Sequence, residues 1–400
     1  MSVEFGLNTP VLFGAGCADQ LGEICKMHGG TKVMLVCDPN LGDATYQRLF
    51  KSLEGAGLEY VFFNKTKQDA PVEIVNEVGN IAKENGCDCF VGVGGGSTLD
   101  TCKGASILAH NPGPADQYIL ADPITVDVHV PVILMPTTAG TGSEGTRVAV
   151  ISIKDNGNDM KWSVFIQLAH TIIDPELTYT LPPYETAYTG MDALAHAIEG
   201  ITAIEENPLS HAVGLDAIRL ISRYLLRAYH NPNDLEARTA MAKAAWEGGV
   251  AFDGPLTHCG HATADGLSTF FHTPHGVNCA LAIPECAALI GGAIPERIKE
   301  VAEAFEIPMT GGETGEQLGN MIADKCRAMM MEMRIPSVRQ LGHGREEMLK
   351  VSTETETSHL SAGCPVKMTH EIAVDLAYKV YDNYPGPENP WVDKSAEVKD

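Results

Sequence analysis

Short apolar stretches alternate with helical patterns over the first 150 residues, and this alternation restricts the fold more than any other feature. A short apolar run bounded by turn residues predicts a buried strand. Such runs are KVMLVCD (Lys32 to Asp38), LEYVFFN (Leu58 to Asn64), CDCFVGVGGGS (Cys87 to Ser97) and VPVILMPTTAGTGSE (Val130 to Glu144). Helical patterns such as 72–85 lie between them. The alternation predicts an α/β domain with a parallel sheet covered by helices on both faces.

The pattern changes at Pro182 and Pro183. Beyond them the apolar residues recur at helical spacing in 213–229, 235–252, 295–305, 314–333 and 370–384, with almost no convincing strand. We therefore predict an α/β domain over residues 1–181 and an all-helical domain over residues 182–400.

The composition limits the partners and the compartment. The formal net charge of −24 disfavours nucleic acid and anionic membrane surfaces as partners. The N-terminus lacks the features of a signal peptide, and no apolar run approaches the length of a membrane span. Eleven scattered cysteines do not form a disulfide framework and predict reduced, buried thiols. We expect a soluble, cytoplasmic protein.

Residues in the second half have the spacing of a divalent-metal site. Asp192 and His196 are four apart, so on a helix their side chains leave the same face one turn apart. The segment 258–276 holds four histidines, among them His261 and His275. One helix would separate these two by about 21 Å, so both can bind one ion only if the chain breaks between them, as Pro274 predicts.

One carboxylate with three imidazoles suits Fe(II) or Zn(II), and ligand type alone does not separate the two ions. A single histidine in such a segment would more often be structural. The joint pattern favours the metal.

Glycines at the end of the third predicted strand indicate a phosphate-binding loop. Gly95, Gly96 and Ser97 precede a helical pattern, and free backbone N–H groups at a helix start bind a pyrophosphate. The GxGxxG pattern of the first turn of a Rossmann fold is absent. Asp38, at the end of the first predicted strand, offers a carboxylate for ribose hydroxyls and favours NAD over NADP. The alternatives are a tight turn and an acid that simply ends a strand.

Taken together, these motifs resemble the iron-containing (group III) alcohol dehydrogenase family over essentially the whole chain. PTTAGTGSE, IIDPELTYTLPPYETAYTGMDALAHAIE, NPLSHAVGLDAIRLI and FHTPHG carry the resemblance. It implies a dinucleotide-binding α/β domain, a helical domain, the architecture shared with dehydroquinate synthase, and a homodimer or larger homo-oligomer.

The resemblance also implies roles for individual residues. The implied metal ligands are Asp192, His196, His261 and His275. The implied cofactor-binding residues are Asp38, Gly95, Gly96, Ser97, Asp100, Lys103, Thr137, Thr138 and Thr141, to which we add Lys161.

The chain departs from the family pattern near the expected substrate. Asp265 stands where the family commonly has a second histidine, so Asp265, His258 and His272 are candidates for proton transfer, the two histidines with a structural role as the alternative. Arg147 is a candidate for binding an anionic substrate group, unless it pairs with one of the many acids. Phe252 is a further substrate candidate.

These observations predict an NAD-dependent, iron-dependent alcohol dehydrogenase or aldehyde reductase acting on a small molecule, with zinc as the alternative metal. Hydride would pass between the substrate carbon and the nicotinamide. A zinc enzyme resembling dehydroquinate synthase or glycerol dehydrogenase is the alternative function. A non-catalytic metal or nucleotide binder is the third.

Overall fold

A computed structural model describes residues 6–7, 9–119, 130–155 and 158–391. The chain forms two compact units: an α/β unit, Met1–Leu181 with Pro232–Asp253, and a helical unit, Pro182–Asn231 with Gly254–Asp400. The predicted domains differ from this division in one segment. Helix α7 (Leu235–Phe252) groups with the α/β unit because it packs against the short helices η4 (Ser143–Gly145) and η5 (Pro175–Thr178).

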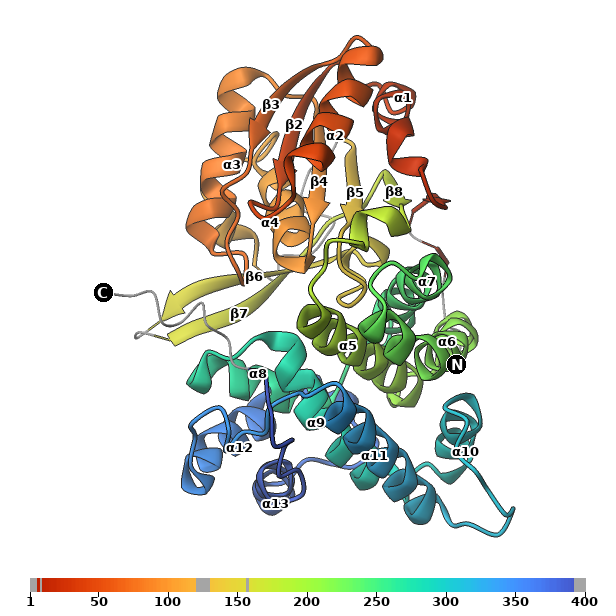
Figure 1. Cartoon of the computed structure of the whole chain (residues 1–400). Coiled ribbons are helices and arrows are strands. Elements are labelled where there is room, and N and C mark those ends of the chain that lie inside the picture. The colour runs from red at the N-terminus through yellow and green to blue at the C-terminus, as the bar shows by residue number, and fades with distance from the viewer. Residues whose placement is uncertain (1–5, 8, 120–129, 156–157, 392–400) are drawn as a thin grey trace. The chain divides into compact units, whose positions relative to one another are not determined.

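The α/β unit is built on a parallel sheet, which confirms the predicted fold class (Figure 1). The strand order is β1-β8-β5-β4-β2-β3. The strands are β1 (Val11–Phe13), β2 (Lys32–Cys37), β3 (Glu59–Phe63), β4 (Cys89–Gly94), β5 (Val132–Pro136) and β8 (His170–Ile173). The central strands β2, β4 and β5 are almost completely buried. Continuous apolar runs are what such positions require.

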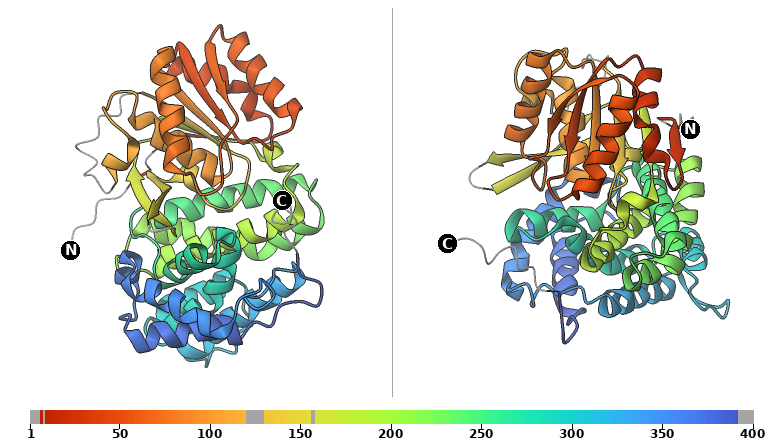
Figure 2. Two further views of the ribbon diagram at one scale, coloured as in Figure 1. Left: turned by 90° about the vertical axis from the view of Figure 1, so that its left-hand side faces the viewer. Right: turned by 45° about the horizontal axis from the view of Figure 1, so that its top comes forward.

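Each face of this sheet packs on its own helical layer, as Figure 2 shows. Met34 and Val36 of β2 belong to the core formed with α3 (Val72–Asn85) and α4 (Gly96–Ile107). Val33 and Leu35 belong to the opposite core, formed with α1 (Leu21–Met27) and α2 (Asp43–Gly55). Successive side chains of a strand point to opposite faces, so a single buried strand contributes to two cores.

An antiparallel hairpin, which the sequence patterns did not predict, completes the α/β unit. Strand β6 (Val148–Asp155) pairs with β7 (Asn158–Phe165) outside the main sheet. The 3-10 helices η1 (Cys17–Gln20) and η2 (Ala115–Tyr118) connect other elements of this unit.

The helical unit confirms the predicted all-helical half, since its described residues contain no strand (Figure 1). Its α-helices are α5 (Pro183–Thr202), α6 (Pro208–His230), α8 (Cys259–Phe271), α9 (His275–Ile290), α10 (Pro295–Ala304), α11 (Gly315–Glu332), α12 (Met348–Thr357) and α13 (His370–Asp382). The 3-10 helices η6 (Arg345–Glu347) and η7 (His359–Gly363) adjoin α12. Across the described part of the chain, no helix combines the length and apolar character needed to cross a bilayer.

Candidate active site

Three helices of the helical unit bring the predicted metal ligands together. Asp192 and His196 lie on α5, His261 lies on α8, and His275 is the first residue of α9. The predicted break is confirmed, because α8 ends at Phe271 and Pro274 caps α9. The break lets His275 turn back toward the helix that carries His261, as no single helix could.

The imidazole rings of His196, His261 and His275 converge on one oxygen of the fourth residue, Oδ1 of Asp192. The Nε2 atoms of His196, His261 and His275 lie 3.8, 3.6 and 3.8 Å from it. These separations exceed hydrogen-bond lengths, and Oδ1 is buried with no hydrogen-bond partner among the described residues. Bonds of about 2.1 Å to a tetrahedral ion would place neighbouring donors about 3.4 Å apart. The residues therefore fit a divalent metal ion.

The ligand side chains differ in the protonation states that their surroundings favour. Burial works against a charge on Asp192, but the neighbouring His196, His261 and His275 outweigh it and hold the pKa of this carboxyl below its ordinary value. Burial lowers the pKa of His196 to about 4 despite the nearby Asp192 carboxylate. Burial would also lower the pKa of His261 and His275, but Cys279 and the nearby carboxylates outweigh it, so the pKa of His275 rises to about 10 and that of His261 well above its ordinary value. A carboxylate and neutral imidazoles are the forms that bind a metal, so metal binding would displace protons from His261 and His275.

Glu199 orients His261, a role that sequence reasoning missed. The Nδ1–H of His261 donates to Oε2 of Glu199 at 2.5 Å, so Nε2 is the nitrogen that faces Asp192 and that would bind an ion. Oε1 accepts hydrogen bonds from the backbone N–H of His258 and Gly260, both at 2.9 Å. Burial opposes the charge of Glu199, but His261 and these bonds lower its pKa to about 2. Its position seven residues after Asp192, on the same helix face, was the available signal.

Cys279 is a second residue that sequence reasoning missed. It is buried on α9, one turn after His275, and its Sγ lies 3.4 Å from His275 Nε2 and 3.7 Å from His261 Nε2. Donor atoms of Asp192, His261, His275 and Cys279 all lie within 4.8 Å of one another. The centre thus offers a sulfur in addition to the predicted oxygen and nitrogens.

The structure separates the three candidates for proton transfer. Asp265 lies beside the centre, with Oδ1 3.8 Å from His275 Nδ1. His272 is the exposed, left-handed residue that ends α8. His258 is completely buried, and its Nε2 lies 2.9 Å from Thr202 Oγ1. Burial of this ring favours the structural alternative for His258, while proton transfer by Asp265 or His272 stays a prediction.

Asp38, Gly95, Gly96 and Thr137 directly follow strands β2, β4 and β5 at one edge of the parallel sheet in the α/β unit. The N–H of Asp38, after β2, donates to Val93 O of β4 at 2.9 Å, and the N–H of Thr137, after β5, donates to Gly94 O at 3.0 Å. Parallel sheets bind ligands at the carboxyl ends of their strands. The helix α4 begins at this edge with Gly95 as its N-cap residue, so its first N–H groups are placed for an anion.

Two glycines allow the loops at this edge to touch. A Cβ on Gly96 would lie 2.5 Å from Thr141 Cγ2, and one on Gly95 would lie 3.2 Å from Thr138 Cγ2. Thr141 can lie close to the backbone of residue 96 only because that residue is glycine. This is a second reason for the glycine, besides the phosphate contact that the sequence indicated.

Asp100 and Lys103 hold the loop that follows β5. The completely buried Nζ of Lys103 donates to Ser143 O and Val148 O, both at 2.6 Å, and to Ser143 Oγ at 2.8 Å. Ser143 Oγ in turn donates to Asp100 Oδ1 at 2.6 Å. These contacts are structural, and a contact of either residue with a cofactor stays a prediction.

Ser97 and Lys161 meet at Asp69. Ser97 Oγ accepts a hydrogen bond from the N–H of Asp69 at 3.0 Å, and Lys161 Nζ lies 2.6 Å from Asp69 Oδ1. The charge of Lys161 is thus balanced within the α/β unit. Cofactor binding by these two residues stays a prediction.

Arg147 pairs with an acidic residue, which was the alternative to binding an anionic substrate. Its Nε donates to Asp253 Oδ2 at 3.2 Å, and its backbone N–H donates to Asp253 Oδ1 at 2.7 Å. Phe252 is the last residue of α7 and is partly buried; it directly precedes Asp253 in the chain. Substrate contacts of Arg147 and Phe252 stay predictions.

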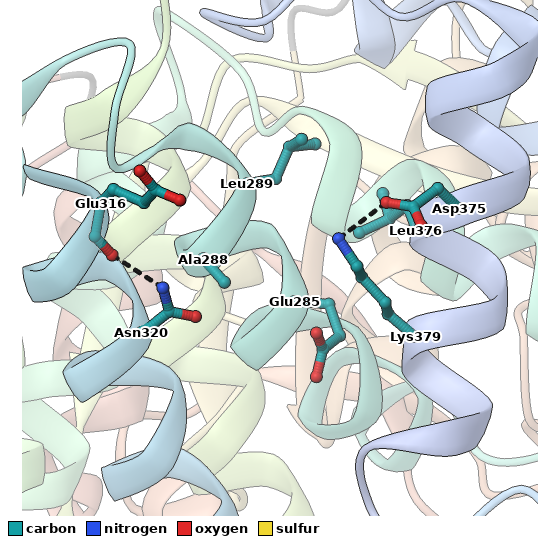
Figure 3. A pocket seen from close by; sticks show the side chains of 8 residues that line it. All are labelled: Glu285, Ala288, Leu289, Glu316, Asn320, Asp375, Leu376 and Lys379. Atoms are coloured by element: carbon teal, nitrogen blue, oxygen red, sulfur yellow. Dashed lines mark hydrogen bonds and ion pairs between the residues drawn. The ribbon is translucent and has the colours of Figure 1, made fainter.

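A surface pocket elsewhere in the helical unit contains none of the predicted site residues (Figure 3). It is lined by α9, α11 and α13, and its residues include the ion pair of Lys379 with Asp375 and the hydrogen bond from Asn320 to Glu316 O. Because these polar groups satisfy one another, the metal centre remains the better candidate for catalysis.

The comparison with known proteins agrees with both units. Residues 8–175 match the family model "Iron-containing alcohol dehydrogenase", and residues 186–381 match "Fe-containing alcohol dehydrogenase family, C-terminal". The choline dehydrogenase of Bacillus subtilis is 34% identical over 390 residues, 94% of each chain. The sulfoacetaldehyde reductase of Bilophila wadsworthia is 33% identical over 295 residues, 73% of this chain and 76% of the relative.

A solved structure extends the agreement to three dimensions. Sulfoacetaldehyde reductase from Bifidobacterium kashiwanohense, in complex with NAD+, superposes with a TM-score of 0.84 at 26% identity, covering 96% of this chain and 99% of the other. The resemblance seen in the sequence is thereby confirmed. The chain belongs to the iron-containing alcohol dehydrogenase family of NAD-dependent oxidoreductases.

Proposed function

We propose that the protein transfers hydride between NAD and a small alcohol or its aldehyde, with Fe(II) held by Asp192, His196, His261 and His275. The observation that carries the proposal is the buried Asp192 Oδ1, which has three imidazole nitrogens 3.6 to 3.8 Å away. A buried carboxylate oxygen without a hydrogen-bond partner is stabilised by a neighbouring cation, which the surrounding imidazole nitrogens would help to bind. When bound, the ion acts as a Lewis acid toward the substrate oxygen.

The chain's own residues prepare this chemistry. Glu199 fixes the tautomer of His261 so that Nε2 points into the centre. Asp265 Oδ1 lies 3.8 Å from His275 Nδ1, beyond hydrogen-bond length, so its carboxylate acts on that ring through its charge. In the α/β unit, the start of α4 would bind the pyrophosphate of NAD, and Asp38 would accept hydrogen bonds from the ribose hydroxyls.

The charge of the preferred substrate is the open question of specificity. One relative is named for choline, which is cationic, and another for sulfoacetaldehyde, which is anionic. The pairing of Arg147 with Asp253 lowers the charge that Arg147 offers to an anion. An assay panel should therefore contain neutral, cationic and anionic aldehydes, and a preference for anions that disappears in Arg147→Ala would assign that residue to the substrate.

Anaerobic reconstitution tests the proposed function. Protein loaded with Fe(II), or with Zn(II), is assayed for net NADH formation from alcohols and for NADH consumption with aldehydes. We expect His261→Ala to abolish metal retention and turnover together, while His230→Ala, which changes an exposed histidine paired with Glu332, leaves both unchanged.

Two results would contradict the proposal. One is full turnover by metal-free His261→Ala protein. The other is tight NAD binding without net redox turnover of any alcohol or aldehyde, which would favour the chemistry of dehydroquinate synthase or a non-catalytic binder.

We further propose that the protein acts in the cytoplasm as a homodimer or larger homo-oligomer. All eleven cysteines are buried free thiols, as expected in a reducing compartment. Analytical ultracentrifugation of the reduced, metal-loaded protein measures the assembly, and a monomer at micromolar concentration would contradict it.

A further inference from the structure

Three cysteines and a histidine form a second buried cluster in the helical unit, behind the metal centre. His258 is the N-cap residue of α8 and Cys259 is its first residue, Cys286 lies on α9, and Cys364 directly follows η7. The exposed fractions are 5% for Cys364 and zero for the other three. None of these four side chains is needed by the proposed reaction.

The donor atoms of this cluster lie close together. Cys259 Sγ is 3.4 Å from Cys286 Sγ, and His258 Nδ1 is 3.7 Å from Cys286 Sγ. The donors of His258, Cys259 and Cys364 lie within 4.8 Å of one another. The separations of 3.4 and 3.7 Å are near the spacing of about 3.8 Å that Zn–S bonds of about 2.3 Å produce in a tetrahedron.

The tautomer of His258 directs a lone pair into the cluster. The hydroxyl of Thr202 donates its hydrogen to Ile198 O at 2.6 Å, so its Oγ1 accepts from the Nε2–H of His258 at 2.9 Å. A neutral imidazole with its proton on Nε2 has its lone pair on Nδ1. That nitrogen faces Cys286 and also lies 3.4 Å from Glu199 Oε1. Without an ion, the thiol of Cys286 can donate to this lone pair, and a metal ion that replaces the thiol proton would find the nitrogen already directed at it.

We propose that His258, Cys259, Cys286 and Cys364 bind a zinc ion in a structural site distinct from the Asp192 centre. Three thiolates and one imidazole are a common donor set of structural zinc. Binding would release the three thiol protons to solvent and form three Zn–S bonds and one Zn–N bond. The ion would join the start of α8, the middle of α9 and the end of η7, and so fix the two helices that carry His261 and His275.

The contrast with another thiol pair supports this assignment. Cys25 and Cys89 are completely buried and in hydrogen-bond contact in the α/β unit, within an apolar core. Neither belongs to any group of candidate metal-binding side chains in the described chain. Proximity of buried thiols therefore does not by itself assemble such a donor set, and this pair provides a matched control.

Metal content tests the proposal in the full chain. Protein purified anaerobically with reductant and Zn(II) should carry about two zinc ions per chain. Cys286→Ala/Cys364→Ala should lose about one and keep the ion at Asp192, whereas His196→Ala should lose the ion at Asp192 and keep the other. Cys89→Ala should keep both. The two sites therefore fail separately.

A measurement on protein with an intact cluster covers the case in which the double variant does not fold. Zinc-edge X-ray absorption of His196→Ala protein should report three sulfurs at about 2.3 Å and one nitrogen at about 2.0 Å. The proposal is overturned by a wild-type content of one zinc or less, by a sulfur-poor ligand shell, or by a Cys259–Cys286 disulfide in the reduced, zinc-supplied protein.

Discussion

At the scale of single residues, protonation state decides what the metal centre can bind. Glu199 is completely buried, yet it keeps its charge because three backbone N–H groups and the His261 ring surround its two oxygens. Gly260 makes this possible, since a Cβ there would lie 2.8 Å from Oε2. A carboxylate that fixes a histidine tautomer typically raises metal affinity by about 10–100-fold.

We therefore expect Glu199→Gln to weaken metal binding by about 10–100-fold, because the neutral amide orients His261 less strongly and adds N–H groups opposite backbone donors. Chelator competition measures the dissociation constant. Glu285→Gln is the matched control, since this buried glutamate on α9 pairs with Arg327. Equal affinities for Glu199→Gln and wild type would remove the orienting role.

Cys279 should influence which ion the centre prefers. Soft sulfur donors favour Zn(II), whereas oxygen and imidazole donors serve either ion. We expect Cys279→Ser to lower Zn(II) affinity by a larger factor than Fe(II) affinity, measured by parallel anaerobic titrations. Cys326→Ser, at a buried thiol of α11, is the control. If both affinities fall by the same factor, the sulfur has no part in selecting the metal.

At the scale of elements, the two loops after β4 and β5 act as one unit. Lys103 and Asp100 tie α4 to the loop through Ser143, and Gly96 lets Thr141 approach the start of the helix. The cofactor edge is thus formed by packing between neighbouring elements, so a change of volume at one loop is felt at the other.

We expect Gly96→Ala to destabilise the α/β unit by about 1–3 kcal/mol and to weaken NAD binding, because its Cβ meets Thr141 Cγ2 at 2.5 Å. Denaturant unfolding and calorimetric titration with NAD measure the two effects. Adding Thr141→Ser removes the contacted methyl and should restore part of the loss. Gly55→Ala, where a Cβ has open space, should change stability by less than about 1 kcal/mol. An unchanged Gly96→Ala protein would show that the loops are not coupled.

At the scale of the whole molecule, buried acids make stability depend on pH. Burial raises the pKa of Glu144 from 4.5 to about 7. Below pH 4.5 the group is protonated in both the folded and the unfolded states. As the pH rises through 4.5 toward about 7, the unfolded chain loses this proton first, so the free energy of unfolding falls.

Glu144→Gln should remove this part of the pH dependence. We expect its stability relative to wild type to be higher at pH 8 than at pH 5 by about 2–3 kcal/mol. Urea unfolding at the two pH values measures the difference. Glu84→Gln, at an exposed glutamate of α3, should shift stability equally at both. A flat difference for Glu144→Gln would mean that the carboxyl is ionised in the folded protein without cost.

The sequence predicted the elements whose signals are local. Apolar runs predicted β2, β4 and β5, and the spacing of four placed Asp192 and His196 on one face of α5. The hairpin β6–β7 and the placing of α7 in the α/β unit were missed. The hairpin joins adjacent segments and had a local signal that went unused, the Asn-Gly pair at 156–157 between two apolar runs. The place of α7 depends on packing against η4 and η5, which lie far away in the chain and leave no periodic signal.

The sequence by itself determined the residue types of the candidate metal centre, the helix break at Pro274 and the glycines of the predicted cofactor edge, because each follows from helix geometry or backbone sterics over a few residues. Only the tertiary structure decided that Glu199 and Cys279 join that centre, that Lys103 is enclosed by loop carbonyls, and that His258 gathers with Cys259, Cys286 and Cys364. Burial, tautomers and donor distances depend on which helices pack together, and packing is a property of the folded chain.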